Sequence, residues 1–240
     1  MICDRKQAIA EKFGNKVETY DSDAVMQQGI AAKLAGLLPE HGASDILEIG
    51  AGTGFLTSHI LKRYPDGQFL ITDLSDDMLH FCKTKYAAKN TRFQTMDADT
   101  PNTNEKFDLI VSSMTAQWFD DPSETLNNLK KLLKPNGKIF YSALGPKSFW
   151  EWKETVSSLN LPHGTLTERN YPGIIHEDTE TISYDSTMDF LKDMKKIGAQ
   201  HPKPGYTSLH PAAFRKACAL HDQNHGGKFT WHIVYGCLRA

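Results

Sequence analysis

A glycine-rich turn near residue 50 limits what this chain can fold into more than any other feature of its sequence. The stretch from Leu47 to Phe55, LEIGAGTGF, joins a short apolar segment typical of a buried strand to an amphipathic segment typical of a helix. Glycines at such a junction let the backbone approach a ligand closely, with its amide groups and the helix start directed toward it. In open parallel sheets, this junction borders the crevice where ligands bind. We therefore expect a ligand-binding turn here.

Strand-like and helix-like segments alternate through the first 145 residues, which is the order that builds a parallel sheet with helices on both faces. The expected strands cover Ile46–Ile49, Gln68–Thr72, Arg92–Thr95, Phe107–Ser112 and Lys138–Ala143. The expected helices cover Asp23–Leu38, Phe55–Tyr64, Asp76–Ala88 and Pro122–Leu133, with a turn at Pro135, Asn136 and Gly137. The sequence therefore predicts an α/β protein with a doubly wound sheet.

Past residue 145 the alternation is weaker. We expect a helix that carries Phe149, Trp150 and Trp152, then a loop over Leu161–Gly173, which is rich in proline and glycine. Further strands are expected over Thr179–Tyr184 and Phe229–Leu238, and further helices over Ser186–Ile197 and Pro211–His221. Because these segments extend one end of the sheet, we predict a single domain over residues 1–240.

Charge and composition exclude several classes of protein. Lys and Arg number 27 against 29 Asp and Glu, and this net charge of −2 argues against affinity for the phosphates of nucleic acid. The four cysteines form no C-x-x-C pair, which is typical of a reducing compartment. The first twenty residues lack the apolar run of a signal peptide, and no segment is apolar enough to span a membrane. We therefore expect a cytoplasmic protein with no nucleic-acid or membrane partner.

The residues around the glycine turn disfavour nucleotide cofactors. Phe55 stands where a dinucleotide fingerprint has glycine or alanine, and no lysine follows Gly54 as it would in a phosphate-binding loop. The carboxylate of Glu48 would repel a pyrophosphate and attract a cation. The stretch from Glu48 to Gly54 resembles the E/D-x-G-x-G-x-G motif of class I methyltransferases, whose cofactor S-adenosylmethionine carries an ammonium and a sulfonium.

Two further carboxylates follow the next expected strands. Asp73 ends the second strand, where a carboxylate can accept hydrogen bonds from both ribose hydroxyls. Asp97, followed by Ala98, matches the methyltransferase position that meets the adenine amino group. The alternative is that both aspartates are helix caps or turn formers. Their register with the glycine turn favours the cofactor interpretation.

Sequence patterns after the fourth strand narrow the range of methyl acceptors that we expect. The stretch from Ser112 to Trp118 lacks the Asn or Asp, Pro-Pro and aromatic residue used to methylate amino groups of bases or glutamine. No Pro-Cys dipeptide is present for covalent attack on a pyrimidine ring. A small molecule or a carrier-borne acyl group is therefore the expected acceptor.

Several pieces spread over nearly the whole chain, including regions outside the cofactor fold, resemble the malonyl-acyl-carrier-protein O-methyltransferases, the BioC family of biotin synthesis. They are the N-terminal run from Gln7 to Gln28, the tripeptide Ala116-Gln117-Trp118, the stretches Leu144–Ser148 and Lys196–Ala199, and the ending Thr230–Gly236. One departure is Lys153, where the family often has arginine. The resemblance implies a mostly parallel, Rossmann-like sheet of the class I methyltransferase type, with about seven strands and an antiparallel C-terminal strand.

The resemblance also implies how the domain is organised and which residues form its sites. Residues 1–40 would form a helical lid, 45–145 the cofactor core and 146–240 the substrate side. The implied cofactor-binding residues are Tyr20, Gln27, Glu48, Gly50, Ala51, Gly52, Gly54, Asp73, Leu74, Met78, Asp97, Ala98, Ser113 and Met114. The implied substrate-binding residues are Tyr20, Gln117, Trp118, Lys147 and Lys153. Lys147, Lys153, Lys192, Lys195 and Lys196 are candidates for docking an acidic carrier protein.

The reaction implied by the resemblance is methyl transfer from S-adenosylmethionine to the free carboxylate of malonyl-acyl carrier protein or malonyl-coenzyme A. A carboxylate is ionised at neutral pH, so we expect no catalytic base, only proximity and alignment. Two alternatives stay open: methylation of another small carboxylate, and a noncatalytic assembly factor with the same fold. Cys218, His221 and His225 have a spacing that can place metal ligands on one helix face, but methyl transfer needs no metal and we predict none.

Overall fold

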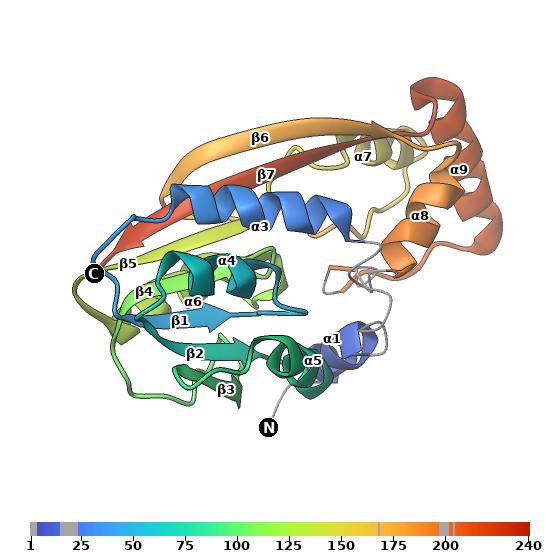
Figure 1. Ribbon diagram of the computed structural model, residues 1–240. Coiled ribbons are helices and arrows are strands. Elements are labelled where there is room, and N and C mark those ends of the chain that lie inside the picture. The colour runs from blue at the N-terminus through green and yellow to red at the C-terminus, as the bar shows by residue number, and fades with distance from the viewer. Residues whose placement is uncertain (1–3, 15–23, 168, 197–201, 204) are drawn as a thin grey trace.

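The sheet of this protein combines a parallel half with an antiparallel edge. The computed structural model describes residues 4–14, 24–167, 169–196, 202–203 and 205–240, and within them the strands follow the order β3-β2-β1-β4-β5-β7-β6 (Figure 1). The strands are β1 (Asp45–Ile49), β2 (Gln68–Asp73), β3 (Thr91–Thr95), β4 (Phe107–Ser113), β5 (Leu133–Leu144), β6 (Ile174–Ser183) and β7 (Lys228–Arg239). β1 to β5 pair in parallel, whereas β7 runs antiparallel to both β5 and β6. The predicted fold class is thus confirmed.

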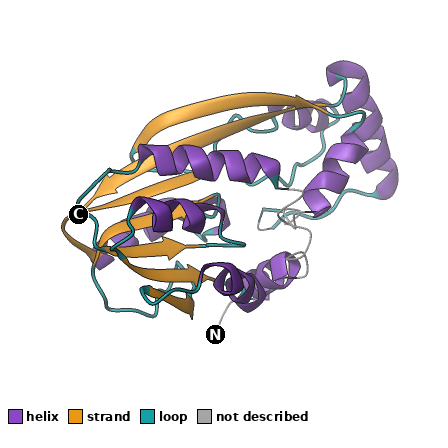
Figure 2. Cartoon of the chain, viewed as in Figure 1, coloured by secondary structure: helices purple, strands orange, loops and turns teal. Residues whose placement is uncertain are grey.

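Helices pack on both faces of this sheet (Figure 2). They are α1 (Asp4–Gly14), α3 (Val25–Leu37), α4 (Phe55–Arg63), α5 (Asp76–Tyr86), α6 (Pro122–Leu129), α7 (Trp150–Ser158), α8 (Thr187–Lys196) and α9 (Pro211–His225). Short 3-10 turns η1 (Ala116–Trp118) and η2 (Lys130–Leu132) flank α6. In β1, Ile46 belongs to the core that α3 and α4 cover, while its neighbour Leu47 belongs to the core that α6 covers. This alternation buries both faces of the central strands.

Element boundaries differ from the predictions where tertiary pairing prevails over local pattern. The expected helix Pro122–Leu133 ends at Leu129, because Leu133 already pairs with Phe107 as the first residue of β5. β5 therefore includes the expected turn at Pro135, Asn136 and Gly137, with Asn136 in the left-handed region at a φ of 68°. β6 begins at Ile174, five residues before the expected Thr179, since its pairing with β7 continues to Gly236.

Helix α1 lies within the helical lid that the resemblance implies for residues 1–40, although the residue pattern predicted no separate helix at these positions. It contains Lys6 and Ile9 as buried residues, three positions apart on one face. Helix α9 extends four residues beyond the expected end at His221, and it stops at Gly226, which adopts the left-handed conformation of a helix C-terminus. None of the described helices has the length and apolar character to cross a membrane.

Candidate functional site

A cavity of about 770 Å³ opens where the parallel strands end. The predicted residues that line it are Gln27, Glu48, Gly50, Ala51, Gly52, Asp73, Leu74, Met78, Asp97, Ala98, Ser113, Met114, Gln117 and Trp118. Three other predicted residues, Gly54, Lys147 and Lys153, do not line it, and Tyr20 lies outside the described residues. The structure therefore brings together most of the predicted cofactor set from segments scattered between residues 27 and 118.

Each of the three glycines in the turn after β1 is required for a different physical reason. Gly50 has a φ of 69°, and a Cβ atom there would lie 2.3 Å from Thr115. Gly52 has a φ of 56° and no neighbouring atom within 4 Å of such a Cβ, so the space beside it belongs to the cavity. Gly54, with a φ of 97°, is held by packing, since its Cβ would lie 2.3 Å from the ring of Tyr86. The first two glycines shape the cavity, and the third lets α4 approach α5.

Glu48 places a buried carboxyl group in the cavity wall. Its side chain is 1 % exposed, and its Oε2 accepts a hydrogen bond of 2.7 Å from the hydroxyl of Thr57 on α4. Burial raises the pKa of Glu48 to about 8, with a contribution from the nearby charge of Asp73. A cationic group bound beside Glu48 would offset this cost of burial and favour the ionised carboxylate.

Asp73 ties the end of β2 to the glycine turn. Its Oδ2 accepts a hydrogen bond of 2.8 Å from the backbone amide of Gly52, and its Oδ1 accepts one of 2.8 Å from the amide of Ser75. Burial raises the pKa of Asp73, while these amide hydrogen bonds oppose the shift. Each oxygen keeps acceptor capacity for a further donor, as binding a pair of hydroxyl groups requires.

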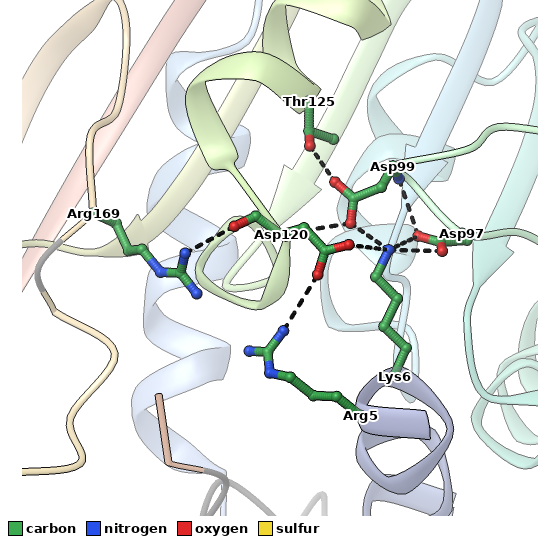
Figure 3. A network of polar contacts seen from close by, with 7 residues as sticks. All are labelled: Arg5, Lys6, Asp97, Asp99, Asp120, Thr125 and Arg169. Carbon is green, nitrogen blue, oxygen red and sulfur yellow. Dashed lines mark hydrogen bonds and ion pairs between the residues drawn. The ribbon is translucent and has the colours of Figure 1, made fainter. Parts of the chain in front are cut away.

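A lysine that the sequence analysis missed lies at the other acidic end of the cavity (Figure 3). The Nζ atom of Lys6, on α1, lies 2.8 Å and 2.7 Å from the two carboxylate oxygens of Asp97. It also lies 2.5 Å from Asp99 Oδ2 and 3.2 Å from Asp120 Oδ2. Burial lowers the pKa of Lys6, but hydrogen bonds to Asp97 and Asp99 prevail and raise it above its ordinary value.

The loop after β4 combines backbone strain with an unsatisfied polar atom. Met114 has a φ of 52°, which non-glycine residues rarely adopt, and its amide donates to the carbonyl of Ser142 at 3.0 Å. Gln117 is 3 % exposed, and its Nε2 donates to the carbonyl of Met114 at 2.8 Å. Its Oε1 atom is buried and has no hydrogen-bond partner within the described residues. A buried acceptor in this state is ready for a donor from a ligand.

Part of the cavity is lined by an aromatic chamber, defined here by Phe149, Trp152, Phe190, Phe214 and Trp231. Phe149 adopts a φ of 55° and packs against Trp231 and Phe190, with ring centroids 5.0 Å and 5.3 Å away. The neighbouring Trp150 does not line the chamber. The chamber offers an apolar wall to a bound ligand.

The two lysines predicted to bind substrate point elsewhere. Lys153 Nζ donates to the carbonyl of Pro146 at 2.6 Å and to the hydroxyl of Thr167 at 3.2 Å. Lys147 Nζ lies 3.8 Å from a carboxylate oxygen of Glu177 on β6, and its side chain is 71 % exposed. These positions give no support to a substrate role for either lysine. Lys192 and Lys195, at the end of α8, line the cavity instead.

The histidines singled out for their metal-like spacing have other partners. His221 Nδ1 lies 2.8 Å from the hydroxyl of Thr187, and its ring stacks on Phe229 at 4.4 Å between centroids. His225 Nε2 lies 3.3 Å from a carboxylate oxygen of Glu154. Across the described part of the chain, no three His, Cys, Asp or Glu side chains are grouped as a metal site requires.

Comparison with known proteins agrees with this geometry. Residues 47–139 match the family model described as a methyltransferase domain. Among solved structures, the YcgJ protein of Bacillus subtilis shares the fold, with a TM-score of 0.57 and 16 % identity over 89 % of this chain and 97 % of its own. Phosphoethanolamine N-methyltransferase 2 of Haemonchus contortus, solved with S-adenosyl-L-methionine, aligns with a TM-score of 0.52 and 16 % identity, covering 93 % of this chain and 56 % of its own. The fold and the glycine turn define a class I methyltransferase.

Curated relatives narrow this class to one family. The malonyl-[acyl-carrier protein] O-methyltransferase of Magnetococcus marinus is 31 % identical over 97 % of this chain and 92 % of its own length. Malonyl-[acyl-carrier protein] O-methyltransferase 1 of Ilyobacter polytropus is 31 % identical over 99 % of this chain and 95 % of its own. The chain belongs to the malonyl-[acyl-carrier protein] O-methyltransferase family.

Proposed function

We propose that this protein transfers a methyl group from S-adenosylmethionine to the free carboxylate of malonyl-acyl carrier protein. The observation that carries the proposal is that one cavity is lined both by an acidic end, formed by Glu48, Asp73 and Asp97, and by the aromatic chamber. The acidic end suits a cationic cofactor, and the chamber suits an acyl thioester. Relatives that include a biotin biosynthesis bifunctional protein from Saccharophagus degradans support a role for the methyl ester in making the pimeloyl part of biotin. We also propose that the reaction takes place in the cytoplasm, which the absence of a C-x-x-C pair among the four cysteines supports.

The residues at the acidic end fit the cofactor by their donor and acceptor chemistry. Glu48 would hold the ammonium of the methionine portion, directly or through water, and Asp73 would accept the two ribose hydroxyls. Asp97 would accept the adenine amino group, with Leu74, Met78 and Ala98 as the apolar wall around the ring. Gly52 leaves room for the ligand because a side chain there would enter the cavity. When bound, S-adenosylmethionine supplies an electrophilic methyl group on a positively charged sulfur.

The residues beyond β4 would align the acceptor with that methyl group. A carboxylate oxygen forms a bond to the methyl carbon as the carbon–sulfur bond breaks, so that carboxylate and sulfonium become an ester and a thioether. No proton moves, since the carboxylate is already ionised at neutral pH. Met114, Gln117 and Trp118 would position the acceptor, and the aromatic chamber would keep water away from it.

The acceptor assignment has two competing candidates. Neither Lys147 nor Lys153 lines the cavity, so the cation expected to hold a malonyl carboxylate is missing from the predicted positions. A different small carboxylate held mainly by apolar contacts therefore stays a second candidate. Malonyl-coenzyme A is a third, because it presents the same acyl group on another thiol.

A methyl-transfer assay with the purified protein tests this proposal. Malonyl-acyl carrier protein, malonyl-coenzyme A and an aconitate-type acid are each mixed with S-adenosylmethionine, and the methyl ester is measured by mass spectrometry. We expect the carrier-bound substrate to give the highest kcat/KM, and the Asp73→Asn variant to lose most of this activity. Ester formation only from a free acid would overturn the acceptor assignment. Failure of S-adenosylhomocysteine to bind in calorimetry would overturn the enzymatic assignment and favour a noncatalytic role.

A further inference from the structure

One ammonium group joins helix α1 to two loops at the acidic end of the cavity (Figure 3). Lys6 is 5 % exposed, and its Nζ atom contacts the carboxylates of Asp97 and Asp99, which follow β3, and of Asp120, which follows η1. Arg5 NH1 adds an ion pair of 3.5 Å with Asp120. Without the ammonium of Lys6, three carboxylates would face one another at short range and repel.

The same helix forms part of the cavity wall. Lys6, Ile9, Ala10 and Phe13 all line the cavity, and their spacing of three, four and seven residues places them on one helix face. The ring of Phe13 meets Trp118 edge to face, with centroids 5.5 Å apart. Any ligand in the Asp97 end of the cavity therefore touches a surface whose position depends on how α1 is held.

Lys6 also restricts what Asp97 can still bind. Asp97 Oδ1 accepts from Lys6 and, at 3.0 Å, from the backbone amide of Asp99, which uses both of its acceptor positions. Among the described residues, Asp97 Oδ2 accepts from Lys6 alone, so one acceptor position is left for a ligand donor. The lysine thus orients the carboxylate and leaves one direction open.

We propose that Lys6 is a positioning residue that couples cofactor binding to the docking of helix α1, by holding Asp97 in one orientation and α1 against the cavity. The proposal rests on the proposed function for the identity of the cofactor. This role of Lys6 differs from that of a purely structural ion pair in one respect. Ligand binding and the docking of α1 stabilise each other, so each is weakened when the other is lost.

Calorimetric titration of S-adenosylhomocysteine into the full-length protein tests the first half of this coupling. We expect Lys6→Met to weaken binding by about tenfold or more and Lys6→Arg to restore most of the loss, because arginine keeps the charge. Lys12→Met is the matched control, since Lys12 lies on the same helix without lining the cavity, and its affinity should stay within twofold of wild type. In assays, Lys6→Met should raise the KM for S-adenosylmethionine by a larger factor than the KM for the acceptor, because Lys6 contacts Asp97 directly and reaches Trp118 only through Phe13.

Hydrogen exchange of the α1 amides tests the second half. Saturating S-adenosylhomocysteine should slow exchange over residues 4–14 in the wild-type protein and much less in Lys6→Met. If Lys6→Met fails to fold, Asp120→Asn removes one partner of the lysine without touching the cavity lining, and about threefold weaker binding is expected. Two outcomes would overturn this inference and leave the proposed function standing. In one, S-adenosylhomocysteine binds the wild-type protein without slowing exchange of the α1 amides. In the other, Lys6→Met binds S-adenosylhomocysteine as tightly as the wild-type protein does. No binding to the wild-type protein would overturn the proposed cofactor and the inference together.

Discussion

Among the individual residues, Glu48 combines nearly complete burial with a clear electrostatic consequence. Its pKa of about 8 means that the carboxyl is mostly protonated at neutral pH when nothing cationic lies beside it. A folded-state pKa above the unfolded value means that the folded protein binds an extra proton between these two values. The free energy of unfolding therefore falls as pH rises from about 4.5 to about 8 through this group. A bound ammonium would favour the ionised carboxylate and so oppose this loss of stability.

This linkage predicts a pH-dependent affinity for S-adenosylhomocysteine. The affinity should rise as pH increases from about 6 to about 8, where Glu48 ionises, and binding near neutral pH should release a proton. Glu48→Gln should remove this pH dependence and weaken binding by roughly 10- to 100-fold, because a hydrogen bond to a charged group is lost. Calorimetry in buffers of different ionisation enthalpy measures both effects. An unchanged pH profile in Glu48→Gln would refute the assignment.

Sequence reasoning at the residue scale succeeded where a residue's neighbours in the chain reveal its role. Glu48 lies in the last part of a predicted strand, and Asp73 and Asp97 follow the next two, so the sheet itself brings them to one cavity. Lys6 gave no such signal, because its partner Asp97 lies 91 residues away along the chain. The sequence likewise could not show that Lys153 turns toward Pro146 and Thr167, since that direction depends on tertiary packing.

At the scale of elements, the predictions were best where strands are buried on both faces. The apolar runs that became β1, β2 and β4 were placed within one residue of their ends, because burial of both faces leaves continuous hydrophobic stretches. Only the second half of β6 was predicted. None of its residues is buried, and Ile174 and Ile175 at its start are exposed, so the strand has no buried face that would give an alternating pattern. Helix α1 was missed because its apolar face is short.

The contact between α4 and α5 predicts that two neighbouring glycines respond differently to alanine. Gly54→Ala should lower the free energy of unfolding by about 2–4 kcal/mol, because a left-handed alanine is strained and its Cβ overlaps the ring of Tyr86. Gly52→Ala should lower it by only about 1 kcal/mol, since the space beside Gly52 is open. Urea unfolding measures both values. If both variants lose the same free energy of unfolding, the packing of Gly54 against α5 is not the reason that this position requires glycine.

On the scale of the whole molecule, the cavity is built by elements that lie far apart in the chain. Strand ends and α1 supply the acidic part, while α7, α8, α9 and β7 supply the aromatic chamber. Class I methyltransferase architecture was predictable because its core is a local alternation of strands and helices. The chamber was not predictable in detail, because its residues come from segments with weak patterns and long connections.

The division of the cavity predicts separable kinetic effects. Trp152→Ala should raise the KM for the acceptor by about tenfold and leave the Kd of S-adenosylhomocysteine within twofold. Glu48→Gln should instead raise the Kd of S-adenosylhomocysteine and leave the KM for the acceptor within twofold. The double variant should show both effects additively, because the two side chains share no partner in the described residues. Thermal unfolding checks that Trp152→Ala still folds. Strong non-additivity would mean that the two ends act as one site.

The antiparallel direction of β7 has a practical consequence for experiments on this protein. Its last residues pair with the middle of β5, where Arg239 lies opposite Lys138, and Ala240 lies at the end of the sheet where the parallel strands begin (Figure 1). The ligand cavity is lined by residues at the other end of these strands. A fluorophore, affinity handle or surface anchor joined after Ala240 would stand clear of both ligands. The same group joined ahead of Asp4 would sit beside α1 and disturb the wall that Lys6 holds in place.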